Sequence, residues 1–315
     1  MLERKAYSSA AVPFRGREIC AAALSILTLA IVARASNIPA RVAILDLGDS
    51  STGRRAGGTI EEMFASPDIR KIIRIVDREQ TGAAAKGIGY DGSLNLTIEQ
   101  ARDLGSAIGC DFYFLGNAQT VKRSPSNGPS YFESFASVFL ISARTGRLVF
   151  WERPAIKRDS PEDAEKALIS ILSARETCSR YISAITRVAQ QERAERTSLV
   201  EVKTPFILSM ADDQAEENKD VRAPRPYRRL KPAYPESAAR AEVEATVDVL
   251  VDIDAQGEVG LVEIERWAGY GLDQSVIETV KQMHFFPAMR NGVAIPMRVL
   301  LRYNFRKPPI QNSSS

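Results

Sequence analysis

Histidine is almost absent from this 315-residue chain, since His284 is the only one. It stands between Met283 and Phe285 near the end of a predicted helix, where a surface or capping role is expected. A Ser/His/Asp triad needs a histidine in a suitable setting, and a zinc site needs Cys and His clustered at ligand spacing. Neither pattern occurs in the sequence, so we expect no enzyme, no metal site and no cofactor.

Patterns for binding nucleotides and nucleic acids are missing as well. Residues 87–92 match the string G-x-G-x-x-G, but roughly ten residues separate them from the nearest predicted strand, and the dinucleotide fingerprint needs a strand directly before it. The net charge of +3 is carried by residues 1–35, and the remainder balances 37 basic against 37 acidic side chains. A balanced chain has no general attraction for nucleic acid. No small-molecule substrate is evident either.

One long run without charge is present, at residues 19–33. As a helix it would rise about 22 Å, which is short of the ~30 Å hydrocarbon core of a bilayer. Arginines precede the run and Ala33-Arg34-Ala35 follows it, so residues 1–35 are predicted to be a secretory signal peptide cleaved between Ala35 and Ser36. An uncleaved signal anchor is the alternative, because flanking arginines can snorkel. Both outcomes place the rest of the chain outside the cytoplasm.

Cysteine is scarce, and only Cys110 and Cys178 follow the predicted signal. In an oxidising compartment these two residues could form a disulfide. Cys110 begins a predicted strand, and Cys178 lies in the middle of a predicted helix. Two buried free thiols are the alternative.

Residues 36–196 show the pattern of a mixed α/β domain. A helix is predicted to start near Ile60 after a glycine-rich break. Residues 80–96 are predicted to be a loop. A second helix is predicted from the N-cap Thr97 to Gly109. Ser160 and Pro161 begin one long helix that extends to residue 196. The predicted strands give a sheet with an antiparallel end and cover residues 41–47, 71–77, 111–122, 131–142 and 147–151.

Residues 197–230 are predicted to be a flexible linker, with a docking strand within 202–210 as an alternative for that part. Its second half is acidic over 211–220 and basic over 221–230. The basic run is either the soluble end of the linker or a site for an acidic partner, a lipid headgroup or an acidic polymer. Its members are Arg222, Arg225, Arg228, Arg229 and Lys231.

Residues 231–307 are predicted to be a β-β-α-β unit, followed by a disordered tail at 308–315. Residues 243–254 alternate between apolar and polar side chains and are predicted to be a strand. Residues 254–257 form a hairpin loop, and residues 259–267 form the second strand of the hairpin. A helix begins at Leu272. The whole chain is therefore expected to be α+β. The last strand places five apolar side chains on one face, namely Met297, Val299, Leu301, Tyr303 and Phe305.

This unit resembles the C-terminal domain of the TonB family over residues 224–306. The pieces that match are Tyr234-Pro235, the 254–257 hairpin, Leu272-Asp273, residues 285–288, Gly292 and the final strand. The sequence departs from the family pattern at Lys231, where glutamine is usual, and at Met283, where tryptophan is usual.

The resemblance implies that an open sheet edge accepts an extended segment of an outer-membrane transporter or another envelope protein. For the side chains of the last strand, packing in the core is the alternative, so the binding prediction concerns the backbone edge. The residues expected near the partner are Lys231, Pro232, Tyr234, Pro235, Leu301, Tyr303 and Phe305.

Two roles are compatible with this resemblance. One is an energy transducer anchored in the inner membrane by residues 19–33 and coupled to an inner-membrane motor complex. Residues 19–33 lack the histidine that such anchors carry, and a long proline-rich spacer is missing. The other role is a periplasmic or secreted scaffold or assembly protein that transduces no energy.

Residues 40–152 resemble, more weakly, the α/β domain of the CsgG group and the N-terminal domain of TolB-type proteins. The matching pieces are residues 42–46, 75–78 and 101–111, Gly116, and Thr145-Gly146-Arg147 with Trp151. This resemblance implies a binding or assembly module without catalysis.

Overall fold

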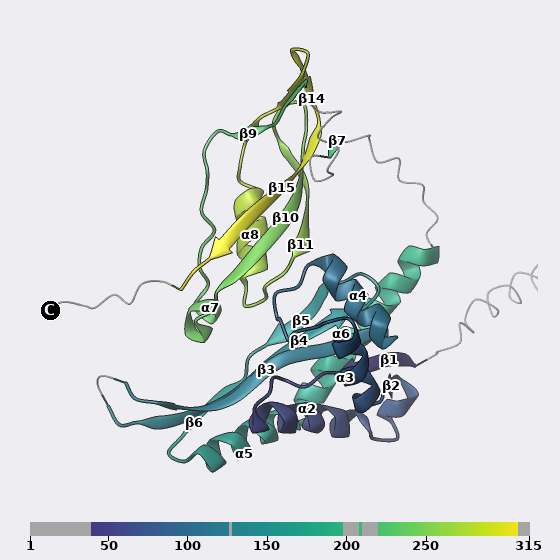
Figure 1. Ribbon diagram of the computed structural model, residues 1–315, viewed down its shortest axis with the longest axis vertical. Helices are drawn as coiled ribbons and strands as arrows, with labels where there is room; N and C mark the ends of the chain where they lie inside the picture. Colours follow the sequence, from purple (N-terminus) through teal and green to yellow (C-terminus); the bar gives the residue numbers. More distant parts are fainter. Residues whose placement is uncertain (1–38, 126–127, 198–207, 210–219, 308–315) are drawn as a thin grey trace, which may run out of the picture. The chain divides into compact units, whose positions relative to one another are not determined.

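A six-stranded sheet organises the first half of the protein (Figure 1). Its strands run in the order β2-β1-β3-β4-β5, and β6 pairs with β4. The first three strands in this order are parallel to one another, and the other pairings are antiparallel. This confirms the predicted mixed sheet with an antiparallel end. The strands are β1 (Ala40–Ile44), β2 (Ile73–Ile75), β3 (Phe112–Arg123), β4 (Tyr131–Ser142), β5 (Leu148–Glu152) and β6 (Ala155–Arg158).

The computed structural model describes residues 39–125, 128–197, 208–209 and 220–307. The described residues from Pro39 onward group into one compact unit. The predicted signal segment with its cleavage site at Ala35 and Ser36, the acidic run at 211–219 and the predicted tail at 308–315 lie outside the described residues. None of the helices that the structure describes has the length and the hydrophobicity that spanning a bilayer requires.

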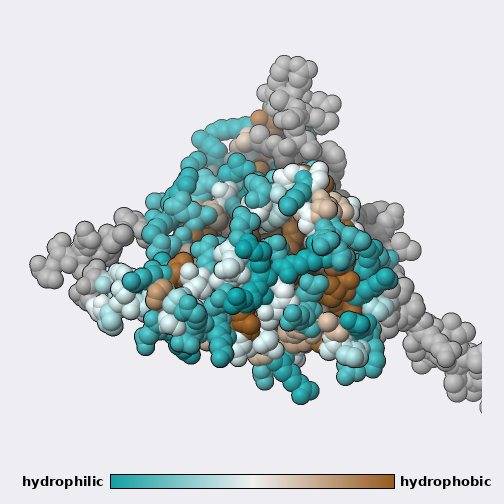
Figure 2. Space-filling model, turned by 60° about the horizontal axis from the view of Figure 1, so that its bottom comes forward, coloured by the Kyte–Doolittle hydropathy of each residue, from teal (hydrophilic) through white to brown (hydrophobic). Residues whose placement is uncertain are grey.

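Helices cover both faces of the sheet. One face packs against α2 (Ser51–Phe64), α5 (Pro161–Leu172) and α6 (Arg175–Thr197), around the ring cluster of Phe64, Phe114 and Tyr181. The other face packs against α3 (Arg78–Gly87) and α4 (Ile98–Ile108). The face turned forward in Figure 2 is largely hydrophilic, and its hydrophobic residues are exposed only in small separate areas.

The predicted glycine-rich break before Ile60 is wrong, because α2 is one continuous helix. Ser50 caps it by accepting a hydrogen bond from the backbone N–H of Gly53. A Cβ atom at Gly53 would lie 2.1 Å from the carbonyl oxygen of Leu47. Glycine there permits close approach of the helix to the preceding chain, and the cap offsets part of its low helix propensity.

Two other helix predictions also need correction. The predicted loop at 80–96 begins with α3, whose N-cap is Asp77. The predicted helix over 160–196 starts as expected, with Ser160 accepting from the N–H of Asp163, but it is divided at Ser173 and Ala174 into α5 and α6. The hydroxyl of Thr177 donates to the carbonyl of Ile171 at 2.8 Å across this break. It thereby satisfies one of the carbonyl groups that the end of α5 leaves open.

The possible disulfide is wrong, since Cys110 and Cys178 are both free. Cys110 packs against the core on the α3–α4 face of the sheet, whereas Cys178 is buried in the core on the α2–α5 face. The sheet therefore separates the two sulfur atoms.

We expect Cys110 to resist alkylation. Burial, together with the negative charge of Asp111, raises the pKa of the Cys110 thiol to about 12. Because the thiolate is the nucleophile, its reaction with iodoacetamide near neutral pH should be roughly a thousandfold slower than that of a free cysteine. Peptide mapping by mass spectrometry measures this rate, and the urea-unfolded chain is the control. If Cys110 is alkylated as fast in the native protein as in the urea-unfolded chain, the prediction that burial raises its pKa is wrong.

The second sheet has the order β11-β10-β15-β7. The predicted β-β-α-β unit is confirmed by β10 (Ala245–Ile253), β11 (Val259–Arg266), α8 (Leu272–Val280) and β15 (Met297–Phe305). The apolar face of β10 packs with Val276 and Val280 of α8 in one core. A short helix that the sequence did not indicate, α7 (Glu236–Ala241), precedes β10.

Residues 220–230 belong to this domain, which corrects the linker prediction for that segment. Here β8 (Val221–Arg222) pairs with β13 (Ala288–Arg290), and β9 (Arg225–Pro226) pairs with β12 (Phe285–Phe286). The strand β14 (Val293–Ile295) completes a hairpin with β13. Earlier in the predicted linker, β7 (Leu208–Ser209) pairs with β15, as the alternative of a docking strand expected.

Candidate functional site

Within the part of the chain that the structure describes, the outer edge of β15 is open along most of its length. On one side, β15 pairs with β10 from Met297 to Phe305. On the other side, β7 pairs in parallel with Met297 and Arg298 only. Among the described residues, no strand pairs with the outer edge from Val299 to Phe305. This edge is the one that the sequence predicted to receive a partner.

The side chains of β15 divide between two faces, as the alternation predicted. Met297, Val299 and Phe305 are buried, and Leu301 and Tyr303 are half-buried against the same core. The hydroxyl of Tyr303 lies 3.5 Å from Sδ of Met283. These side chains hold the strand in place, so only the backbone edge is available to a partner.

Tyr234 links the predicted Tyr-Pro motif to the end of β15. Its ring centroid lies 6.2 Å from that of Phe305, and its hydroxyl donates to the carbonyl of Val243 at 2.6 Å. Pro235 is the N-cap of α7, Pro232 is half-buried and Lys231 is exposed. The structure therefore brings Tyr234 and Phe305 together, and Tyr234 acts there as a packing residue.

The opposite face of β15 carries cross-strand ion pairs. Nε of Arg298 lies 2.5 Å from Oδ1 of Asp252, and Nε of Arg302 lies 2.7 Å from Oδ1 of Asp248. Arg266 also contacts Asp248, at 3.2 Å. Burial alone would raise the pKa of Asp248, but hydrogen bonds and charge from both arginines outweigh it and hold the pKa below its usual range. Arg298 and Arg302 on this face of β15 therefore both have a carboxylate partner on β10.

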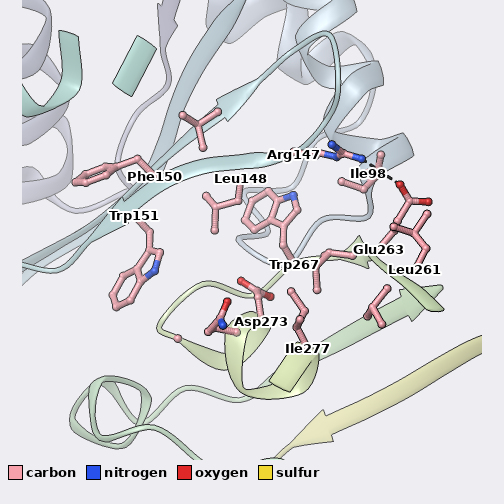
Figure 3. Close-up of a pocket in the computed structure, with 15 residues that line it drawn as sticks. Ile98, Arg147, Leu148, Phe150, Trp151, Leu261, Glu263, Trp267, Asp273 and Ile277 are labelled. Atoms are coloured by element: carbon pink, nitrogen blue, oxygen red, sulfur yellow. Dashed lines mark hydrogen bonds and ion pairs between the residues drawn. The ribbon is translucent and has the colours of Figure 1, made fainter. Parts of the chain in front are cut away.

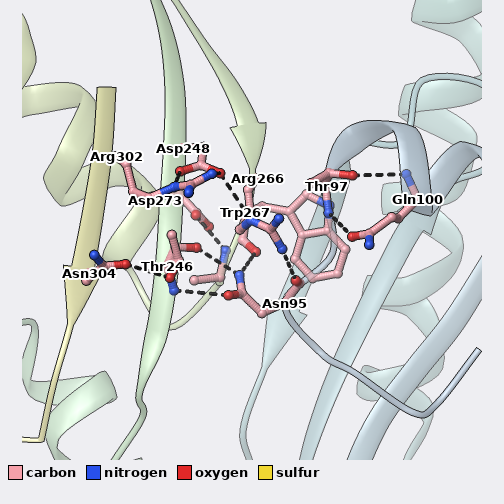
Figure 4. A network of polar contacts seen from close by, with 11 residues as sticks. Asn95, Thr97, Gln100, Thr246, Asp248, Arg266, Trp267, Asp273, Arg302 and Asn304 are labelled. Carbon is pink, nitrogen blue, oxygen red and sulfur yellow. Dashed lines mark hydrogen bonds and ion pairs between the residues drawn. The ribbon is translucent and has the colours of Figure 1, made fainter. Parts of the chain in front are cut away.

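A polar network joins this domain to the loop between α3 and α4, which carries Asn95 (Figure 4). The amide nitrogen of Asn95 donates to the carbonyl of Trp267 at 2.7 Å and to that of Thr246 at 2.9 Å. Its amide oxygen accepts from the N–H of Thr246, and Arg266 donates to the carbonyl of Asn95. The polar groups of Asn95 are therefore paired with groups of the second domain.

Trp267 is the apolar centre of the same contact. It is 1% exposed, and its Nε1 donates to the carbonyl of Gly146 at 3.0 Å. Its ring centroid lies 5.9 Å from that of Phe139, and Tyr270 packs against both Phe139 and Trp151. This interface was not predicted from the sequence. The available signal was a tryptophan at the end of an alternating strand, just before Gly269 and Gly271.

A cavity of about 560 Å³ lies beside this contact, between β5, β11 and α8 (Figure 3). Its wall is mostly apolar and includes Trp151, Leu261 and Ile277. Arg147 and Glu263 form an ion pair of 3.3 Å at its margin. Asp273 is engaged, because its two oxygen atoms accept the backbone N–H groups of Ala268 and Gly269 at 2.8 Å.

His284 is exposed, as predicted, and its Nδ1 lies 3.1 Å from Glu258. Residues 87–92 begin at the end of α3 and continue as a loop, so they lack the strand–turn–helix context of a dinucleotide site. No group of three or more potential metal ligands occurs among the described residues.

Comparison with known proteins identifies the second domain. Residues 231–306 match the family "Gram-negative bacterial TonB protein C-terminal". "Protein TonB" of Vibrio cholerae serotype O1 is 32% identical over 78 residues, which are 24% of this chain and 32% of that protein. This chain therefore matches about a third of the length of that relative. Residues 231–306 are a TonB C-terminal domain, which relates the chain to TonB-family proteins of the cell envelope.

Two solved structures are similar to parts of the chain. The TonB C-terminal domain of Pseudomonas aeruginosa is 22% identical, covers 32% of this chain and 94% of its own length, and has a TM-score of 0.25. Lipoprotein GNA1162 from Neisseria meningitidis is 13% identical, covers 47% of this chain and 99% of its own length, and has a TM-score of 0.29. The resemblance of residues 40–152 to the CsgG and TolB groups stays a prediction.

Proposed function

We propose that this protein binds an extended segment of an envelope protein by adding it as a strand to the free edge of β15, and that it does so without catalysis. The observation that carries the proposal is the edge from Val299 to Phe305, which no strand of the described residues covers. In strand addition, backbone hydrogen bonds supply affinity and pockets for side chains supply selectivity. The TonB C-terminal domain favours an outer-membrane transporter as the partner.

Cross-linking tests the edge. Leu300 is 41% exposed on β15, and Leu261 is 51% exposed on β11 at the other end of the same sheet. We expect a Leu300→Cys variant to form disulfides with cysteine-bearing peptides taken from the periplasmic segments of outer-membrane transporters. Bound peptide has a high local concentration, so the yield should exceed that of the matched Leu261→Cys control at least roughly tenfold. Equal yields at the two edges would refute strand addition at β15.

A scaffold or assembly role without energy transduction is the second candidate. It is favoured by the contact of Trp267 with Gly146 and Phe139, because this contact holds the binding domain on the α/β domain. An energy transducer would keep residues 19–33 in the inner membrane and contact a motor complex there. The intact mass of the native protein separates the two, since a chain that begins at Ser36 has no anchor from which to pull.

A further inference from the structure

A cluster of exposed apolar side chains and of arginines that have no carboxylate partner among the described residues lies in the small strands of the second domain. Its members come from β8, β9 and the following residue, β12, β13 and β14, and we call it the arginine–aromatic patch. Strand pairing places Arg225 opposite Phe286 and Arg290 opposite Val293. Figure 1 shows β9 and β14 at the end of this domain that lies away from α7. The patch consists of Arg222, Arg225, Tyr227, Phe286, Arg290 and Val293.

The three apolar members are unusually exposed. Tyr227 is 60% exposed, Phe286 is 51% exposed and Val293 is 64% exposed, and they are three of the seven large hydrophobic side chains that are exposed among the described residues. The rings of Tyr227 and Phe286 are in edge contact, with centroids 4.2 Å apart. The guanidinium of Arg225 lies 5.7 Å from the Phe286 ring centroid. Contiguous exposed apolar side chains, such as those of Tyr227 and Phe286, mark interaction surfaces.

The arginines of the patch differ from others in the same domain. Arg266, Arg298 and Arg302 each pair with a carboxylate. In the described part of the chain, no carboxylate lies within ion-pair distance of Arg222, Arg225 or Arg290. Within the described residues, the patch therefore presents positive charge without a carboxylate partner, beside apolar side chains.

We propose that the arginine–aromatic patch binds the surface of an anionic lipid bilayer. Guanidinium groups reach lipid phosphates, and aromatic rings settle at the level of the headgroups. A bilayer interface also buries apolar side chains such as Val293 and Phe286, in addition to the electrostatic attraction. A soluble acidic polymer would satisfy the charges but leave these apolar side chains in water, so the composition favours lipid.

Vesicle binding by the purified full chain tests the proposal. We expect stronger co-sedimentation with vesicles of phosphatidylglycerol and phosphatidylcholine than with phosphatidylcholine alone. The double variant Arg225→Gln with Arg290→Gln should lower the partition coefficient about 30-fold, because each arginine near an anionic surface contributes to binding. Phe286→Ala should lower it about tenfold through lost apolar burial.

The matched control removes the same charge elsewhere. Arg175 and Arg187 are exposed on α6, and replacing both with Gln should leave vesicle binding unchanged. Residues 1–35 are common to all variants, so any lipid affinity of that segment cancels in the comparison. Equal binding by the two double variants would overturn the proposal. Retention by dextran sulfate without a preference for phosphatidylglycerol would also overturn it and assign the patch to an acidic polymer. Far-UV circular dichroism verifies that each variant is folded.

Discussion

Replacing Trp267 with alanine is expected to lower the free energy of unfolding by about 4 kcal/mol, as removal of a fully buried tryptophan does. Trp267 is 1% exposed and packs against Phe139 of the first sheet. Its loss also leaves the carbonyl of Gly146 without this donor. Because this residue connects the two domains, we further expect the urea unfolding of the variant to separate into two transitions. Far-UV circular dichroism measures this unfolding.

Trp267→Phe is the matched control for this prediction. It retains an aromatic ring but lacks the N–H that Gly146 accepts, so its cost should be only about 1–2 kcal/mol. A Trp267→Ala protein that unfolds in a single transition at the wild-type urea concentration would show that this loop does not couple the two domains.

A stable contact of this kind also has a consequence for the proposed function. A partner bound at β15 would be held at a fixed place relative to the α/β domain, as an assembly protein requires. If Trp267→Ala shows separate transitions and a protein that also carries Leu300→Cys still forms the cross-link, the β15 edge binds its partner without the contact to the α/β domain. If cross-linking is lost as well, the contact with the α/β domain shapes the binding edge.

Regular alternation made parts of the fold predictable from sequence. The strand predicted at 131–142 coincides with β4, and the apolar set of β15 lies on one face as expected. The helix α2 was not predictable in the same way, because its glycines have low helix propensity. Only the structure shows the carbonyl of Leu47 at the place where a side chain on Gly53 would lie.

The candidate site was predictable only in part, for a similar reason. An open edge follows from the order of strands in one domain, which the family resemblance implied. The contact of Asn95 with Trp267 joins residues 172 positions apart, and neither residue carries a local pattern that indicates its partner. The break between α5 and α6 at Ser173 and Ala174 likewise depends on tertiary contacts such as that of Thr177 with Ile171.

Asp248→Asn is expected to produce the second large effect, a loss of about 2 kcal/mol of unfolding free energy near neutral pH. The side chain of Asp248 is 3% exposed and accepts hydrogen bonds from Arg302 and Arg266. Without its charge, both guanidinium groups lose their carboxylate. Arg302 is more than half exposed and can be hydrated instead, which limits the cost. Glu244→Gln, in an exposed ion pair with Arg306, is the control and should cost less than about 0.5 kcal/mol.

The pH dependence distinguishes this charge from a packing effect. Since Arg302 and Arg266 hold the pKa of Asp248 below its usual range against the effect of burial, the folded state favours the carboxylate more than the unfolded state does. The stabilisation is therefore complete above the unfolded pKa and is lost as the pH falls through the folded one. The difference between wild type and Asp248→Asn should stay constant from about pH 7 to pH 5 and shrink below about pH 4. Urea unfolding across this range measures it, and a difference that persisted unchanged in acid would show that the carboxylate charge is not its source.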